Sequence, residues 1–344
     1  MIWILLIAFV VQQCSTDDFP FPPERNPDLE KSRRCTYLRT HGMLGADCND
    51  LKLVDIPPNL RSGIEVLDVT FNRIRDIYNT SFENYPYLRI LYLTDNSISH
   101  IEAGAFDPIP DLEILDLTLN SLHFVPEALE TLTSLKKLML ANNPFVEVTF
   151  SKSLPSVQYL SLSSCRLKKF PDFSPLPGLV QLNMSDNNLQ TIDMTQVAPM
   201  CSLKLLDLRR NTRLFRREYC NCEVLAKWFT NLSREGFELL PEIGVFCKNK
   251  TEGREIIDDP EICFTNTTAL LLEKSESIRR TCEVEVMNYT SAALKLKASA
   301  KWVIIVLTSL GIIFVCAFCL YYVRKRQAFL KAASARPMHT KCAS

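Results

Sequence analysis

The stretches IEVLDVTFN (residues 64–72), LRILYLTDN (residues 88–96) and LEILDLTLN (residues 112–120) follow one nine-residue frame. Leu or another apolar residue stands at its first, fourth and sixth positions, and Asn at its ninth. Seven copies follow at steps of 24, 24, 23, 22, 22 and 24 residues, with ninth positions at Asn72, Asn96, Asn120, Asn143, Cys165, Asn187 and Asn211. Units this short cannot bury their own apolar face, so neighbouring copies must stack. The spacing predicts an α/β repeat fold, a solenoid with one parallel sheet.

The segment after the second frame extends the pattern. Residues 101–112 read I-x-x-G-A-F-x-x-I-P-x-L, and together with the frame this resembles the extracellular leucine-rich repeat family. The resemblance implies a horseshoe of seven repeats over residues 61–215, with a concave sheet that binds a partner. It also implies that Leu positions fill the core, and that ninth-position side chains bond loop backbone groups that stacking removes from water.

Both ends of the chain carry apolar segments. Ile2–Val11 is short and is followed by polar residues, which predicts a secretory signal over residues 1–15 and an N-terminal extension over 16–34. Trp302–Val323 holds 22 residues without a charge, about 33 Å of helix and enough to cross a bilayer. Six cations follow it and three precede it, which predicts a single-pass type I plasma-membrane protein with a cytoplasmic tail over 324–344.

Cysteines flank the repeats on both sides. Cys35 and Cys48 precede the first repeat, where a disulfide pair closes the open end of the core in an N-terminal cap over residues 35–60. The cysteines that follow the last repeat resemble the C-terminal cap of extracellular leucine-rich repeat proteins, here over residues 216–263. That resemblance implies two disulfides, Cys220 with Cys247 and Cys222 with Cys263. Zinc sites prefer C-x-x-C or paired His, so no metal site is predicted.

Three further extracellular cysteines complete an odd total of nine. Cys165 takes a ladder position, Cys201 precedes the last frame, and Cys282 lies in a stalk predicted over residues 264–301. An odd number leaves at least one thiol free or joined to another chain. A homodimer linked through Cys282 is one hypothesis, and a cap partner or a free thiol is the alternative. Residues 269–280 favour a short helix within this stalk.

The region before the predicted span is mildly acidic. Removing the six tail cations from the total of 39 leaves 33 cations against 39 anions. That balance disfavours nucleic acid or heparin as the main partner. Glycosylation sequons all precede the span and agree with an extracellular location; they are Asn79, Asn183, Asn231, Asn249, Asn266 and Asn288.

Strand alternation sends frame positions three and five to the concave face. The two rows combine three β-branched residues with aromatic, Met and Asp side chains, which predicts a recognition patch. The alternative is that β-branched residues merely suit a strand. A glycan on Asn183, in the sixth repeat, would cover the face locally and favour repeats one to four. The predicted ligand-binding residues are Val66, Asp68, Ile90, Tyr92, Ile114, Asp116, Met139 and Tyr159.

The sequence lacks G-x-G-x-x-G, G-x-x-x-x-G-K-[ST], G-x-S-x-G and H-E-x-x-H, so no enzyme activity and no cofactor are predicted. From Cys35 to Cys263 and in the span, the chain resembles single-pass extracellular leucine-rich repeat proteins with cysteine caps. That resemblance implies an adhesion or recognition receptor for a protein ligand, in neural development or synapse formation. Two alternatives stay open: an auxiliary subunit of an ion channel, and a receptor for soluble or immune ligands.

Overall fold

The computed structural model describes residues 34–40, 42–150, 154–173, 175–214, 224–230, 236–241 and 269–291, with Thr308, Ser309 and Phe318. The chain divides into two units, Met1–Cys35 and Thr36–Ser344. The helices and strands below belong to the second unit. The predicted signal segment, the cap cysteines Cys220, Cys222, Cys247 and Cys263, and the sequons Asn231, Asn249 and Asn266 lie outside the described residues.

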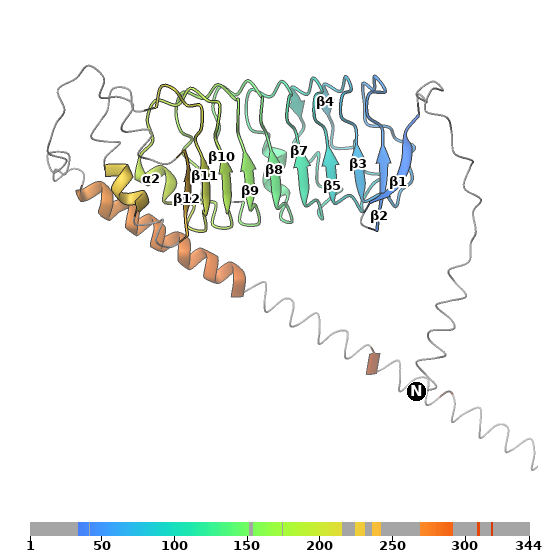
Figure 1. Cartoon of the computed structure of the whole chain (residues 1–344). Helices are drawn as coiled ribbons and strands as arrows, with labels where there is room; N and C mark the ends of the chain where they lie inside the picture. The colour runs from blue at the N-terminus through green and yellow to red at the C-terminus, as the bar shows by residue number, and fades with distance from the viewer. Residues whose placement is uncertain are drawn as a thin grey trace, which may run out of the picture. The chain divides into compact units, whose positions relative to one another are not determined.

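One continuous sheet dominates the described residues (Figure 1). It opens with an antiparallel hairpin of β1 (Thr36–Thr40) and β2 (Met43–Asp47) and continues from β2 in parallel register. The parallel strands are β3 (Val66–Asp68), β5 (Ile90–Tyr92), β7 (Ile114–Asp116), β8 (Lys137–Met139), β9 (Tyr159–Ser161), β10 (Gln181–Asn183), β11 (Leu205–Asp207) and β12 (Glu238–Leu240). Each of the seven frames supplies one strand, as the spacing predicts.

The opposite side of each repeat returns through short elements. The strands β4 (Asp76–Ile77) and β6 (His100–Ile101) pair with each other. Later returns contain the 3₁₀ helix η1 (Glu127–Thr131) and α2 (Met194–Val197), whose capping box is formed by Asp193 and Gln196. Further helices occupy residues 224–230 and 269–291. The return segments thus change from strand to helix along the chain.

The core lies between the sheet and the returns. Frame positions one, four and six are buried in every repeat, from Ile64 to Leu208. Behind the early strands, the buried Phe82 and Phe106 rings stack with centroids 5.9 Å apart. Close packing also explains Gly178, because a Cβ there would lie 2.1 Å from the Pro155 carbonyl oxygen.

The ninth frame positions form a hydrogen-bonded ladder between repeats. In Asn96, Nδ2 donates to the Val69 carbonyl of the preceding repeat (3.0 Å), and Oδ1 accepts from the Ile74 backbone N–H (3.1 Å). The same pattern is found at Asn120, Asn143, Asn187 and Asn211. Asn72 bonds the N-terminal segment in the same way, with its Nδ2 donating to the Cys48 carbonyl. These side chains satisfy buried backbone groups that water cannot reach. The predicted scaffold role of the ladder is confirmed.

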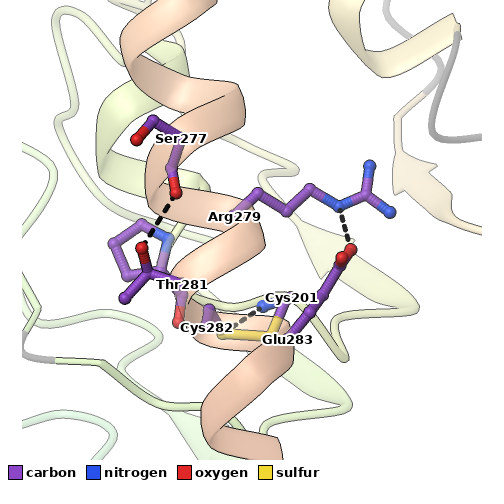
Figure 2. The surroundings of a disulfide bond; sticks show 7 residues. Cys201, Ser277, Arg279, Thr281, Cys282 and Glu283 are labelled. Carbon is purple, nitrogen blue, oxygen red and sulfur yellow. Dashed lines mark hydrogen bonds and ion pairs between the residues drawn. A yellow bond between two sulfur atoms is a disulfide. The ribbon is translucent and has the colours of Figure 1, made fainter.

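Helix 269–291 is longer than the helix predicted for the stalk, and it is joined to the repeats (Figures 1 and 2). Cys282 forms a disulfide with Cys201, 81 residues earlier, with the two Cα atoms 5.9 Å apart. Cys282 is only 2% exposed. The hypothesis of a homodimer linked through Cys282 is therefore wrong, because its sulfur is already bonded within the same chain.

The structure tests the predicted N-terminal cap and the predicted membrane span only in part. Cys35 and Cys48 each take part in a disulfide bond, and their pairing with one another stays a prediction. Within the described residues, no helix is both long and apolar enough to span a bilayer. Apart from Thr308, Ser309 and Phe318, the predicted span Trp302–Val323 lies outside those residues.

Cys165 is the free cysteine among the described residues, and it is buried at its ladder position. Its Sγ lies 3.4 Å from the Leu140 carbonyl oxygen, to which the thiol donates. Burial raises the pKa of this thiol to about 11, against the opposing effect of the Asn143 and Asn142 backbone N–H groups. The predicted structural role of Cys165 thus holds, with a weaker donor in place of the amide.

We expect Cys165 to resist alkylation while the protein is folded. The reactive species is the thiolate, and a raised pKa together with burial keeps the group protonated and inaccessible at mildly alkaline pH. Iodoacetamide labelling followed by peptide mass spectrometry should modify Cys165 quickly in guanidinium chloride and only slowly in native buffer. Equal labelling rates in the two conditions would contradict the burial of this side chain.

Candidate functional site

The predicted binding residues lie in two adjacent rows on the exposed side of the parallel sheet. Frame position three places Val66, Ile90 and Ile114 side by side on β3, β5 and β7. All three are half-buried, unlike the fully buried Leu that follows each of them. The prediction that these residues share one face is confirmed, and together they form a β-branched stripe across the first three repeats.

Frame position five forms the second row, in which Asp68, Tyr92 and Asp116 lie in register and Met139 follows. Each Asp accepts a hydrogen bond at Oδ1 from the backbone N–H two residues later, Thr70 and Thr118, at 2.9 Å. Burial raises the pKa of the Tyr92 hydroxyl, and the two carboxylates raise it further. Tyr92 is therefore a neutral aromatic group between two acids at physiological pH.

The character of the face changes at the fourth repeat. Lys137 and Tyr159 occupy position three on β8 and β9, and the Lys137 Nζ lies 4.9 Å from the Tyr159 ring centroid. Because of this cation–π contact, part of the Tyr159 ring is already in contact with a side chain of the same protein. Tyr159 is thus placed in the predicted row, but the continuous apolar stripe ends at Ile114.

Position two carries a charged row that the sequence analysis missed. Arg89 lies 3.8 Å from the Glu65 carboxylate, and both Arg89 and Lys136 form ion pairs with Glu113. Hydrogen bonds from Lys136 and Arg89 hold the pKa of the Glu113 carboxyl below its ordinary value. In the sequence, this row is indicated by the alternation of Glu, Arg, Glu and Lys at position two of the first four repeats. Because these charges neutralise one another, this row offers little net charge to a ligand.

Position eight, at the end of the loop after each strand, was also missed. Phe71, Asp95 and Leu119 occupy it in the first three repeats with φ of 57°, 52° and 57°. Phe71 is 57% exposed and Leu119 45%. We call these three residues the rim row. Their signal in the sequence was an apolar residue directly before Asn72 and Asn120, where Asn, Asp or Ser stands in most other repeats.

A family model described as leucine rich repeat matches residues 62–122, 86–145 and 155–212. This part of the chain is a leucine-rich repeat solenoid. No curated protein matches the chain. The match confirms the leucine-rich repeats inferred from the frame, while the narrower resemblance to extracellular, single-pass membrane members stays a prediction.

Asn183 lies in the position-five row of the sixth leucine-rich repeat, as predicted. The side chain is half-buried, and its Oδ1 accepts hydrogen bonds from the Ser185 backbone N–H (3.0 Å) and hydroxyl (2.7 Å). The sequons Asn79 and Asn288 lie on exposed positions instead. A glycan on Asn183 would project from the same sheet face as the candidate site. It would cover that face near the sixth repeat, so a ligand would still be expected at repeats one to four.

A groove of about 620 Å³ lies between the leucine-rich repeats and helix 269–291. Its lining includes Glu113, Lys136, Val286 and Tyr289, so it adjoins the charged position-two row rather than the two predicted rows. Within the described ranges, no three His, Cys, Asp or Glu side chains gather as metal ligands would. The site therefore consists of an open sheet face, a surface suited to a macromolecular partner.

Proposed function

We propose that the chain binds a protein ligand through the concave face of its first four leucine-rich repeats. Leucine-rich repeats commonly mediate recognition between proteins. The observation that carries the proposal is the continuous, half-exposed surface of Val66, Ile90 and Ile114 beside Tyr92 and Met139. Apolar and aromatic side chains that gather on one face supply most of the binding energy in protein interfaces.

The specific role that we propose is adhesion or ligand recognition at the cell surface, in neural development or synapse formation. Its support is in the sequence: the predicted signal over residues 1–15, the uncharged segment 302–323 and the cations after it. On this proposal the repeats lie outside the plasma membrane and carry the glycans. On the same proposal the chain would act by binding its ligand and would catalyse no reaction.

The proposal is tested by displaying the full chain on cells and screening it against soluble ectodomains of cell-surface and secreted proteins. For a ligand found in this way, Tyr92→Ala and Met139→Ala should each weaken binding by about tenfold or more, as expected for central contacts. Asn183→Gln should leave affinity unchanged or raise it. The matched control is Tyr78→Ala, because Tyr78 is also exposed but lies in a return segment after β4.

Binding that is unchanged in Tyr92→Ala and Met139→Ala but lost in Tyr78→Ala would overturn the proposal and move the site to the return face. Surface expression of each variant, measured with an antibody to an added epitope tag, separates lost binding from lost protein.

A further inference from the structure

The rim row combines two unfavourable features that the fold does not require. A left-handed backbone conformation costs a non-Gly residue about 1–2 kcal/mol, and large apolar side chains gain nothing from exposure to water. Asn142 and Asp186 occupy the same position in later repeats, and Asn and Asp tolerate this conformation better. Phe71 and Leu119 therefore present apolar side chains where folding alone would favour a small polar residue.

The backbone holds the rim row in place. The Phe71 N–H donates to the Thr94 carbonyl (3.0 Å), Asp95 to Thr118 (3.0 Å) and Leu119 to Ala141 (2.9 Å). Each bond links one repeat to the next, so the three side chains keep a constant spacing. Adjacent strands lie about 4.8 Å apart, which places the two apolar residues about two strand spacings apart with a carboxylate between them.

Three acidic side chains lie in the same part of the face as these apolar residues. Asp95 lies in the rim row, and Asp68 and Asp116 flank Tyr92 in position five. Among the described residues, no cation forms an ion pair with any of the three. The last repeats differ, because Asp207 pairs with Arg209 (2.6 Å) in position five and Asp186 pairs with Arg210 (2.8 Å) in position eight. The same two rows are neutralised at one end and left negative at the other.

We propose that the first three repeats dock a cationic and apolar segment of the protein ligand. Its Lys or Arg side chains would reach Asp68, Asp95 and Asp116, with the Tyr92 ring beneath a cation, and its apolar side chains would cover Phe71 and Leu119. The inference rests on the proposed function and adds the chemistry of the partner. Anionic partners such as heparan sulfate or acidic lipid surfaces are excluded by the same charges.

The test uses the purified full chain and three fluorescein-labelled synthetic peptides of equal length. One alternates Arg and Leu with Ser spacers, the second replaces Arg by Glu, and the third replaces Leu by Ser. Fluorescence anisotropy should show the Arg–Leu peptide binding at least about tenfold more tightly than either of the others, with affinity falling as salt rises. Equal affinity for all three, no binding of the Arg–Leu peptide, or tighter binding of heparin would overturn the inference.

Variants then assign the contacts. Phe71→Gly combined with Leu119→Gly removes the apolar side chains while favouring the left-handed backbone, so folding is preserved. Asp68→Asn combined with Asp116→Asn removes charge while an amide oxygen can still accept from Thr70 and Thr118. Each pair should weaken Arg–Leu peptide binding by about tenfold. The controls Phe124→Ala, at an exposed Phe outside the rim row, and Asp186→Asn should leave it unchanged.

The two proposals fail separately. If Tyr92→Ala and Met139→Ala weaken binding of the screened ligand but the rim and Asp variants do not, only the cationic segment is wrong. If none of these variants affects that ligand, the concave face is not the binding site and both proposals are wrong.

Discussion

Replacing Asn143 by Ala is expected to lower the free energy of unfolding by about 3–5 kcal/mol, because it leaves backbone groups of two repeats without partners. Asn143 is 1% exposed. Its Oδ1 accepts from the Leu122 N–H (3.1 Å), and its Nδ2 donates to the carbonyls of Leu117 (2.9 Å) and Leu140 (3.0 Å). A buried donor or acceptor that loses its partner costs about 1–3 kcal/mol, and alanine removes several such bonds at once.

The matched control is Cys165→Ala, at the same frame position in the next repeat, which has an Asn ladder residue in the repeat on either side. The Cys165 thiol makes only long contacts with carbonyl oxygens and offers no oxygen to the loop before it. Its loss should cost about 1 kcal/mol, mainly in buried apolar surface. Urea unfolding followed by circular dichroism measures both variants. Equal losses of stability would show that the ladder amides contribute little beyond their packing.

Breaking the disulfide between Cys201 and Cys282 is the second large effect, about 4 kcal/mol in the chain-entropy account of a cross-link that closes 81 residues. We expect Cys282→Ser to release helix 269–291 from the repeats. Helices owe most of their stability to tertiary packing, and the residues of this helix that are buried or half-buried form one narrow stripe: Ser275, Ile278, Arg279, Cys282 and Val286. The remaining side chains face solvent and cannot hold the helix in place.

Hydrogen exchange measured by mass spectrometry distinguishes local release from general unfolding. Backbone amides of residues 269–291 should lose protection in Cys282→Ser and in Cys201→Ser, while those of β3 to β8 should keep it. Thr281→Ala is the control, because Thr281 lies beside Cys282 but bonds only the Ser277 carbonyl of its own helix (Figure 2). Full protection of the helix in both Cys variants would contradict a docking role for the disulfide, and a covalent dimer on a non-reducing gel would contradict the pairing itself.

Much of the fold was predictable because the information is local and repeated. Burial of Leu67, Leu91 and Leu115 follows from strand alternation, and the ladder follows from one Asn per stacked loop. The strand β12 was missed since Glu238–Leu240 lies 33 residues after Leu205 and breaks the frame. Its parallel pairing with β11 depends on the route of the intervening chain, which no short-range pattern encodes.

For the candidate site, the sequence predicted which surface each residue lies on, but it did not predict which side chains contact one another. Alternation correctly placed Asp68, Tyr92 and Met139 on one surface. It did not reveal that Lys137 lies over Tyr159, or that Phe71 and Leu119 are exposed at the rim. Those facts depend on side-chain reach between strands and on a turn with positive φ, and both arise only once the repeats are stacked.

The amino-acid sequence by itself determined the repeat, its period, the parallel sheet and the buried ladder, because each unit must bury the same apolar face against its neighbour. Only the tertiary structure decided that Cys201 and Cys282 are partners, that the position-two charges neutralise one another, and that Asp68, Asp95 and Asp116 stay without an ion pair among the described residues. The physical reason is distance along the chain. A frame fixes what a residue does within its own repeat, whereas charge balance and disulfide pairing depend on which distant residues stacking brings within reach.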